Sequence, residues 1–256
     1  MIFTNLIQTN LRTHTFGKQV EYYNRLGSTN EEAWELIDEN TATHGTLVIT
    51  DHQFEGKGRG GKSWFMSPSK GLAMSLILLE SIPVEKAGLI PLAAGAAAAK
   101  TLKNWGSSPT LKWPNDILLN GKKAGGILCE SRLSGESIQS MVVGAGLNVN
   151  ETGNDLPDEI KSTATSLSIE TGHSHQRELV VAIFITFFED YWEILQESPE
   201  EIIRDWTSFC GHLEKPVSFN FKGKNQSGIF KKINHKGDAC IHIDGNERVF
   251  PSIILE

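Results

Sequence analysis

The sequence predicts an α/β fold, with helices packed on a sheet, and a small β-barrel at the C-terminal end. A chain of 256 residues is long for one typical domain and short for two. Helical and strand-like segments alternate as far as about residue 210, which is typical of α/β proteins. From Gly211 onward the pattern changes to short alternating strands between glycine-containing turns. We therefore expect a large domain over residues 1–210 and a barrel of SH3-like size over residues 211–256.

The first half of the chain contains one well-marked helix, two strands and an alanine-rich segment. Residues Gly27–Asn40 predict a helix, because a Ser-Thr pair can cap its start, two glutamates follow at capping-box spacing and an apolar stripe comes next. Thr46–Thr50 and Leu72–Leu79 are short apolar runs typical of strands, the second of them buried. The segment from Val84 to Trp105 should be mostly helical and closely packed.

The second half contains a group of strands and then two strong helices. The Asn120-Gly121 pair between apolar runs is a strong hairpin signal, so the strands on either side of it should pair. The predicted strands are Thr110–Trp113, Ile117–Leu119, Gly126–Ser131 and Ser137–Val149. The predicted helices are Arg177–Leu195, which is rich in Phe and Trp, and Pro199–Phe209.

The composition is that of an ordinary globular protein and restricts the classes of partner. The formal charge is −7 and the sequence pI is about 5.7, so binding to nucleic acid through bulk charge is disfavoured. Three cysteines lie far apart, which fits neither a metal site nor a disulfide framework. The longest small-apolar stretch, Ile90–Ala99, is shorter than the ~18 residues of a membrane span, and the N-terminus lacks a signal-peptide pattern. We expect a cytoplasmic protein with reduced thiols and no membrane partner.

A glycine-rich loop concentrates positive charge in this acidic chain. Residues 56–63, GKGRGGKS, match both the P-loop pattern and the G-x-G-x-x-G pattern, but each of these requires a helix to begin there. Pro68 and Gly71 follow too soon for such a helix. Four glycines interleaved with Lys57, Arg59 and Lys62 nevertheless form a donor-rich cradle for an anion. We favour this interpretation over a mobile surface turn whose charges are only solvated.

Two further polar motifs follow, and each also has a structural interpretation. In KWPND, Lys112–Asp116, the proline favours an extended residue before it and Asn-Asp favours a turn, so polar groups can gather at one strand end. Asp116 could then hold a divalent cation and Lys112 a phosphate, although a packing turn explains the residues equally well. In GKKAGGILCE, residues 121–130, a lysine pair precedes two glycines that allow a ligand close to the backbone. Exposed hairpin lysines are common, so this motif alone is a weak signal.

Six motifs in this order resemble the motif series of the biotin protein ligases. They are GSTN at residues 27–30, GKGRGGKSW at 56–64, KWPND at 112–116, KKAGGIL at 122–128, GAGLNVN at 144–150 and ATSL at 164–167. The resemblance runs from about residue 22 to the C-terminus, and it implies a ligase domain with a mixed sheet and a C-terminal SH3-like barrel. About twenty residues precede it, too few for the DNA-binding domain of some members, so we expect a monofunctional enzyme with no DNA partner.

The resemblance implies an ATP-dependent reaction in two steps. Biotin and MgATP give biotinyl-5′-AMP and pyrophosphate, and a lysine of a biotin carboxyl carrier domain then attacks the mixed anhydride to form an amide. The expected substrates and cofactors are therefore ATP, biotin and Mg²⁺, with no metal site built by the protein. The expected partner is the carrier domain of a biotin-dependent carboxylase, and a homodimer is left open.

The resemblance also assigns site residues, position by position. Lys123 matches the lysine that binds the biotin carboxylate, Arg59 the loop residue that helps retain the intermediate, and Asp116 a candidate partner for the incoming amine. The expected catalytic residues are Lys123, Arg59, Asp116 and Lys112. The expected biotin-binding residues are Ser28, Thr29, Asn30, Gln53, Lys57, Gly58, Arg59 and Lys123. The expected nucleotide-binding residues are Lys57, Arg59, Lys62, Trp64, Lys112, Asn115 and Asn148.

The assignment also bears on binding strength and on rival functions. Lys57 and Lys62 stand where members of the family often have arginine, and lysine lacks the bidentate fork, so the hold on a phosphate should be looser. The biotin ring should lie against a dry wall formed by Trp64 and Gly144–Gly146. The rivals are a lipoate–protein ligase or related acyl transferase, a non-catalytic binding module, and a P-loop NTPase, which would need a helix directly after Ser63.

Overall fold

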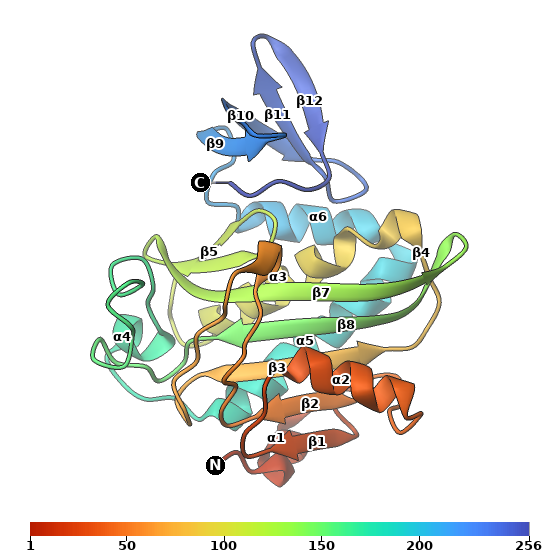
Figure 1. The fold of residues 1–256 in the computed structure, drawn as a ribbon, viewed down its shortest axis with the longest axis vertical. Helices are drawn as coiled ribbons and strands as arrows, with labels where there is room; N and C mark the ends of the chain where they lie inside the picture. The colour runs from red at the N-terminus through yellow and green to blue at the C-terminus, as the bar shows by residue number, and fades with distance from the viewer. Residues whose placement is uncertain (256) are drawn as a thin grey trace.

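A computed structural model describes residues 1–255 of the chain (Figure 1). Its main element is a sheet of eight strands, in which seven follow the order β1-β2-β3-β8-β7-β6-β5 and the short β4 pairs with β8. β1 and β2 are parallel and the other neighbours are antiparallel, so the sheet is mixed, as predicted. The strands are β1 (Val20–Tyr23), β2 (Leu47–Thr50), β3 (Leu72–Leu78), β4 (Ile82–Pro83), β5 (Pro109–Lys112), β6 (Asp116–Leu119), β7 (Lys122–Ser134) and β8 (Ser137–Leu147).

Helices cover both faces of this sheet (Figure 1). On one face α3 (Leu89–Lys103), α5 (Arg177–Glu197) and α6 (Pro199–Ser208) pack on one another, and α1 (Thr4–Asn10) packs on α5. α3 also contacts strands β5 to β8. On the other face α2 (Thr29–Asp38) lies against β2, β3 and β8. Because both faces are covered, every residue of β3 is buried, which explains its almost continuous apolar run.

The alternation of side chains along the central strands divides the core between these two faces. Val48, Ile77 and Val142 are buried against α2. Their neighbours in sequence, such as Leu47 and Leu76, join the larger core under α3 and α5. This is the period of two that a strand requires, so the strand prediction and the two-layer packing support one another.

The parallel pair β1 and β2 places the first motif beside the glycine-rich loop. Parallel neighbours need a crossover connection, and α2 supplies it. The start of α2 and the residues after β2 therefore lie at the same sheet edge, beyond the carboxyl ends of the two strands. Leu26 and Gln53 form a parallel bridge there. Residues 51–71, which connect β2 to its antiparallel neighbour β3, begin and end at this edge.

Most predicted elements are confirmed, with differences at their ends. The predicted helices appear as α2, as a 3₁₀ turn followed by α3, and as α5 and α6. β7 begins at Lys122 rather than Gly126, because the hairpin pairs Leu119 with Lys122 directly across the turn. α1, β1 and α4 (Leu167–Thr171) were not expected. β1 is a four-residue edge strand whose residues are all half-buried, so its sequence carries no clear alternation.

The C-terminal strands form a second, smaller sheet, which Figure 1 shows next to α6. It is antiparallel in the order β12-β11-β10-β9, and no pairing among the described residues closes it into the expected barrel. Trp113 of KWPND donates a 3.0 Å hydrogen bond from Nε1 to the Gly237 carbonyl, so this motif joins the small sheet to the large one. The strands are β9 (Pro216–Phe221), β10 (Lys224–Ile233), β11 (Ala239–Ile243) and β12 (Asn246–Phe250).

Within residues 1–255 no helix is both long and apolar enough to cross a bilayer.

Candidate functional site

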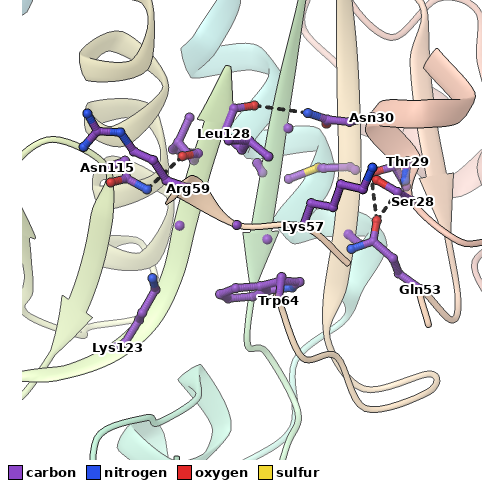
Figure 2. A pocket seen from close by; sticks show the side chains of 18 residues that line it. Ser28, Thr29, Asn30, Gln53, Lys57, Arg59, Trp64, Asn115, Lys123 and Leu128 are labelled. Atoms are coloured by element: carbon purple, nitrogen blue, oxygen red, sulfur yellow. Dashed lines mark hydrogen bonds between the residues drawn. The ribbon is translucent and has the colours of Figure 1, made fainter. Parts of the chain in front are cut away.

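A pocket opens where the glycine-rich loop meets the sheet (Figure 2). It encloses about 480 Å³ of empty space when its open mouth is included, of which about 50 Å³ is cavity that a water-sized molecule can enter. Its walls come from the start of α2, Gln53, the loop, Asn115, and strands β3, β7 and β8. The lining residues are Ser28, Thr29, Asn30, Gln53, Lys57, Gly58, Arg59, Trp64, Ala73, Met74, Asn115, Lys123, Gly126, Ile127, Leu128, Gly144, Ala145 and Gly146. All eight residues expected to bind biotin are among them.

The start of α2 and Gln53 are held together by hydrogen bonds. Thr29 donates to Gln53 Oε1 from its main-chain nitrogen at 2.8 Å, and its hydroxyl oxygen lies 3.2 Å from the same atom. Ser28 is the N-cap residue of α2, but its side chain makes no capping bond, so the capping-box interpretation was wrong. The helix start is therefore stabilised through Gln53, and the Ser28 hydroxyl remains available to the pocket.

Two polar residues that the motifs did not point to lie directly behind this wall. Ser75 Oγ is 2.6 Å from Asn30 Oδ1 and 2.7 Å from Thr29 Oγ1. Asn30 Nδ2 donates to Glu130 Oε2 at 2.7 Å and lies 3.4 Å from the Leu128 carbonyl. A serine inside an otherwise apolar strand was the one sequence signal that could have marked Ser75.

The glycine-rich loop is a compact turn and not the start of a helix. Lys57 and Ser63 form an antiparallel bridge, and the Gly58 N–H donates to the Lys62 carbonyl at 2.6 Å. Residues 59–61 form a short 3₁₀ turn, in which Gly60 and Gly61 have φ of 68° and 76°. Only glycine adopts these angles without strain. The chain after Ser63 is not helical, which excludes both the P-loop and the dinucleotide-binding interpretations.

The two cations of the loop that line the pocket are already paired within the protein. Lys57 forms an exposed ion pair with Glu31, which raises the pKa of the lysine. Arg59 donates to the Ile253 carbonyl at 2.9 Å and to Ser252 Oγ at 2.7 Å, so the C-terminal segment holds the loop from outside. Burial lowers the pKa of the Arg59 guanidinium, which stays charged at neutral pH because its ordinary pKa is very high.

Lys123 is the cation at the opposite side of Trp64 from Gln53 (Figure 2). Its Nζ lies 2.6 Å from Asp116 Oδ1 and 5.9 Å from the centre of the Trp64 ring. Its main chain is fixed by the ATSL segment and the residue before it, since Lys123 N donates to the Thr163 carbonyl at 2.7 Å and Thr165 N donates to the Lys123 carbonyl at 2.9 Å. Asp116 is not part of the pocket lining, but it contacts two lining residues, Lys123 through its side chain and Gly126 through the strand pairing.

The other expected residues are placed less centrally. Asn115 lines the pocket and donates to the Ile127 carbonyl at 3.0 Å. Lys62 lines the neighbouring hollow on the outer side of the loop, and Lys112 faces Asp116 in the β5–β6 register rather than the pocket. Asn148 is buried and donates its side-chain amide to the Thr165 carbonyl at 2.9 Å, so in this structure that amide joins the end of β8 to the segment before α4.

Trp64 forms a tightly fitted wall against β8. A Cβ added at Gly146 would lie 2.4 Å from Cε2 of the indole, so the ring rests directly on the glycine. Likewise a Cβ at Gly144 would lie 2.3 Å from Asn30 Oδ1. The GAG segment therefore leaves the space that Trp64 and Asn30 occupy, which explains the small residues of this motif in physical terms.

The chain is similar to known protein ligases in sequence and in fold. A model of the biotin/lipoate A/B protein ligase family matches residues 22–148. The bifunctional ligase/repressor BirA of Bacillus subtilis (strain 168) is 34% identical over 247 residues, covering 95% of this chain and 74% of that protein. The biotin–[acetyl-CoA-carboxylase] ligase of Paracoccus denitrificans is 30% identical, covering 89% of this chain and 96% of that one. The structure of the biotin protein ligase from Aquifex aeolicus in complex with biotin and ATP has a TM-score of 0.78 at 27% identity, covering 93% and 99% of the two chains.

Proposed function

The chain belongs to the biotin/lipoate A/B protein ligase family, and we propose that it is an ATP-dependent biotin protein ligase. Biotin and ATP form biotinyl-5′-AMP and pyrophosphate, and the biotinyl group then passes to a lysine of a biotin carboxyl carrier domain. Similar proteins are named for this ligation, and the Aquifex aeolicus structure was determined with biotin and ATP. This chain builds a similar fold around a pocket whose lining includes all eight residues expected to bind biotin.

The observation that carries the proposal is the polar floor of the pocket. Gln53 Oε1 accepts a hydrogen bond from the Thr29 main chain, so Gln53 Nε2 is left to donate to a ligand. The Thr29 hydroxyl has one hydrogen, and its neighbours Ser75 and Gln53 keep that hydrogen inside the protein, so a lone pair of Thr29 Oγ1 can accept from a ligand. A cyclic urea offers two N–H donors and one carbonyl acceptor, which complement this floor. The dithiolane ring of lipoate offers neither, so the floor favours biotin.

The remainder of the pocket suits the rest of a biotin molecule. Met74, Ala145 and Trp64 give apolar walls for the ring and the valeryl chain. Lys123 lies beyond Trp64 from the floor residues, so we place the biotin carboxylate beside it (Figure 2). A lysine there neutralises the carboxylate and holds it for attack on the α-phosphate.

The loop cations complete the charge needed for adenylation. The reaction brings a carboxylate and a phosphate together, so positioned cations lower its barrier. Lys57 and Arg59 must first leave Glu31 and the C-terminal segment. The exposed pair Lys57–Glu31 is a weak one, so a phosphate competes with it readily. We assign the nucleotide to this loop, with Lys62 on its outer side and Asn115 at the pocket.

The second step needs an uncharged amine, and Asp116 is our candidate to orient it. A free lysine has a pKa near 10.4, so the carrier lysine arrives as an ammonium that a carboxylate can bind and deprotonate. Asp116 lies at the lysine end of the pocket through its contact with Lys123. Lys112 stands opposite Asp116 in the strand register and adds charge on that side.

A Mg²⁺ ion that enters with ATP is compatible with these residues. No group of three or more His, Cys, Asp or Glu side chains suited to a metal occurs within residues 1–255. Mg²⁺ is usually bound by substrate phosphates, water and one or two carboxylates. Asp116, beside Lys123, is our candidate for such a carboxylate. When bound, the ion would supply further neutralisation of the phosphates.

We propose that the chain is divided near Gly211 into a ligase domain over residues 1–210 and a module over residues 211–256. The open four-stranded sheet and the Phe219–Leu255 bridge are consistent with an SH3-like module. Arg59 contacts the C-terminal segment, so this module also supports the loop of the larger domain.

The decisive experiment measures both steps with the purified chain. Biotin-dependent exchange of pyrophosphate into ATP reports adenylation, and the mass of an added biotin carrier domain reports transfer. We expect exchange and a biotinyl mass increase with biotin and not with lipoate. Exchange with lipoate alone would establish the lipoate ligase instead, and no exchange with either acid would refute a ligase of this type.

A further inference from the structure

The floor of the pocket is part of a series of hydrogen-bonded side chains that includes two residues outside the pocket lining. Thr29, Asn30 and Ser75 are each at most 4% exposed, and their side chains contact one another in sequence. This hydrogen-bonded series ends at the carboxylate of Glu130, in β7. Neither Ser75 nor Glu130 lines the pocket or has a role assigned above, although Glu130 borders the hollow on the outer side of the loop.

The Glu130 carboxylate determines the direction of each hydrogen bond in this series. A carboxylate only accepts, so Asn30 must present its Nδ2 donors to Glu130 and its Oδ1 to Ser75. Asn30 Oδ1 also only accepts, so the single hydrogen of Ser75 points to it at 2.6 Å. Ser75 Oγ then cannot donate to Thr29 Oγ1 at 2.7 Å, so it can only accept there. The hydroxyl hydrogen of Thr29 therefore points into the protein, and a lone pair of Thr29 Oγ1 is left to accept from the ligand.

We propose that Ser75 and Glu130 are positioning residues that set the hydrogen-bond polarity of the pocket floor and so its selectivity for a cyclic urea. The inference rests on the proposed function, because it takes biotin as the ligand. It deepens that function by assigning ligand selectivity to side chains that the ligand does not touch.

The packing around Asn30 supports a site built for one orientation of its amide. Gly144 lies on the Asn30 side of β8, and a Cβ there would meet Oδ1 at 2.3 Å. The amide therefore fits only because the strand carries a glycine at this point. The Ser75 hydroxyl behind it is fully buried, which is costly for packing alone, and it is satisfied here by its contacts with Asn30 and Thr29.

The test compares Ser75→Ala, Glu130→Ala and Glu130→Gln with the wild-type chain. Ser131→Ala, at an exposed position next to Glu130, is the matched control. Pyrophosphate exchange gives kcat and the KM values for biotin, for ATP and for a biotin analogue in which one ureido N–H is replaced by oxygen. Thermal melting shows whether each variant is folded. If Glu130→Ala does not fold, Ser75→Ala decides, since it removes only one oxygen.

We expect both alanine variants to raise the KM for biotin about tenfold, the loss of one buried hydrogen bond, with kcat and the KM for ATP within about twofold. The preference for biotin over the oxygen analogue should fall with it. Glu130→Gln should raise the KM for biotin less than Glu130→Ala, because its amide oxygen can still accept from Asn30 although its N–H groups no longer exclude the reversed direction. An unchanged KM for biotin, an equal rise in the KM for ATP, or damage by Glu130→Gln equal to that of Glu130→Ala would overturn the inference. A wild-type chain without biotin-dependent exchange would instead refute the proposed function.

Discussion

Replacing Gly146 by alanine tests whether Trp64 forms a wall of the biotin pocket. The new Cβ would lie 2.4 Å from Cε2 of the indole and 2.7 Å from Cζ2 and Nε1, whereas carbon atoms in contact are about 3.5–4.0 Å apart. One side must therefore move by about 1 Å. β8 cannot move, because Gly146 is paired with Ala73 on one side and Gly126 on the other. The loop that carries Trp64 is the part that yields, and the ligand-binding surface moves with it.

The size of the effect follows from the cost of overpacking. An extra methyl group in a filled site costs about 1–3 kcal/mol. The free protein avoids this cost by moving the loop, and biotin must pull Trp64 back against it, which corresponds to about 5- to 150-fold in affinity. We expect the KM for biotin in pyrophosphate exchange to rise within this range, while the melting temperature changes little. Gly153→Ala is the control, because a Cβ there meets no atom within 4 Å. The double variant Gly146→Ala with Trp64→Phe should regain part of the affinity, since the smaller ring relieves the overlap. An unchanged KM in Gly146→Ala would refute the role of Trp64 as a wall.

Three further predictions concern charges. Lys123→Ala should reduce biotin-dependent pyrophosphate exchange about a thousandfold, because a cation about 4 Å from an anion near a protein surface contributes about 4 kcal/mol; near-normal exchange would contradict its role. Arg59→Ala releases the loop from Ile253, so biotinyl-adenylate should escape and label lysines of a bystander protein, and labelling confined to the carrier would count against this. Burial raises the pKa of Glu151 to about 7 from 4.5, so the folded protein keeps a proton that the unfolded chain releases. Its free energy of unfolding should fall by up to about 3 kcal/mol between pH 5 and 8, whereas in Glu151→Gln urea denaturation should show that this slope is gone.

Local patterns in the sequence were sufficient for most of the fold. Helical periodicity predicted α2, α3, α5 and α6, and apolar runs with an Asn-Gly turn predicted the central strands. These signals succeed because they depend on residues a few positions apart. β1 and α4 were missed, since the first is a half-buried edge strand and the second is a helix of five residues.

The motif residues of the site were also accessible from the sequence. Ser28, Gln53, Arg59 and Lys123 all line one pocket, although they come from four separate segments. Their residue types indicated an anion and a polar ligand, and the βαβ connection explains why two of the segments meet. Glycine spacing alone suggested a P-loop, and the turn geometry with positive φ removed that alternative.

The sequence by itself therefore determined the fold class, the ligase family and the inventory of charged and polar groups at the site. The tertiary structure decided which of these groups are joined. Asn30 meets Ser75 and Glu130, which lie 45 and 100 positions away, and Arg59 meets Ile253 across 194 positions. Such pairs depend on strand register and on how the two sheets pack, and both are set by burial of the whole core rather than by any local pattern. For that reason the polarity of the pocket floor and the anchoring of the loop could be read only from the folded chain.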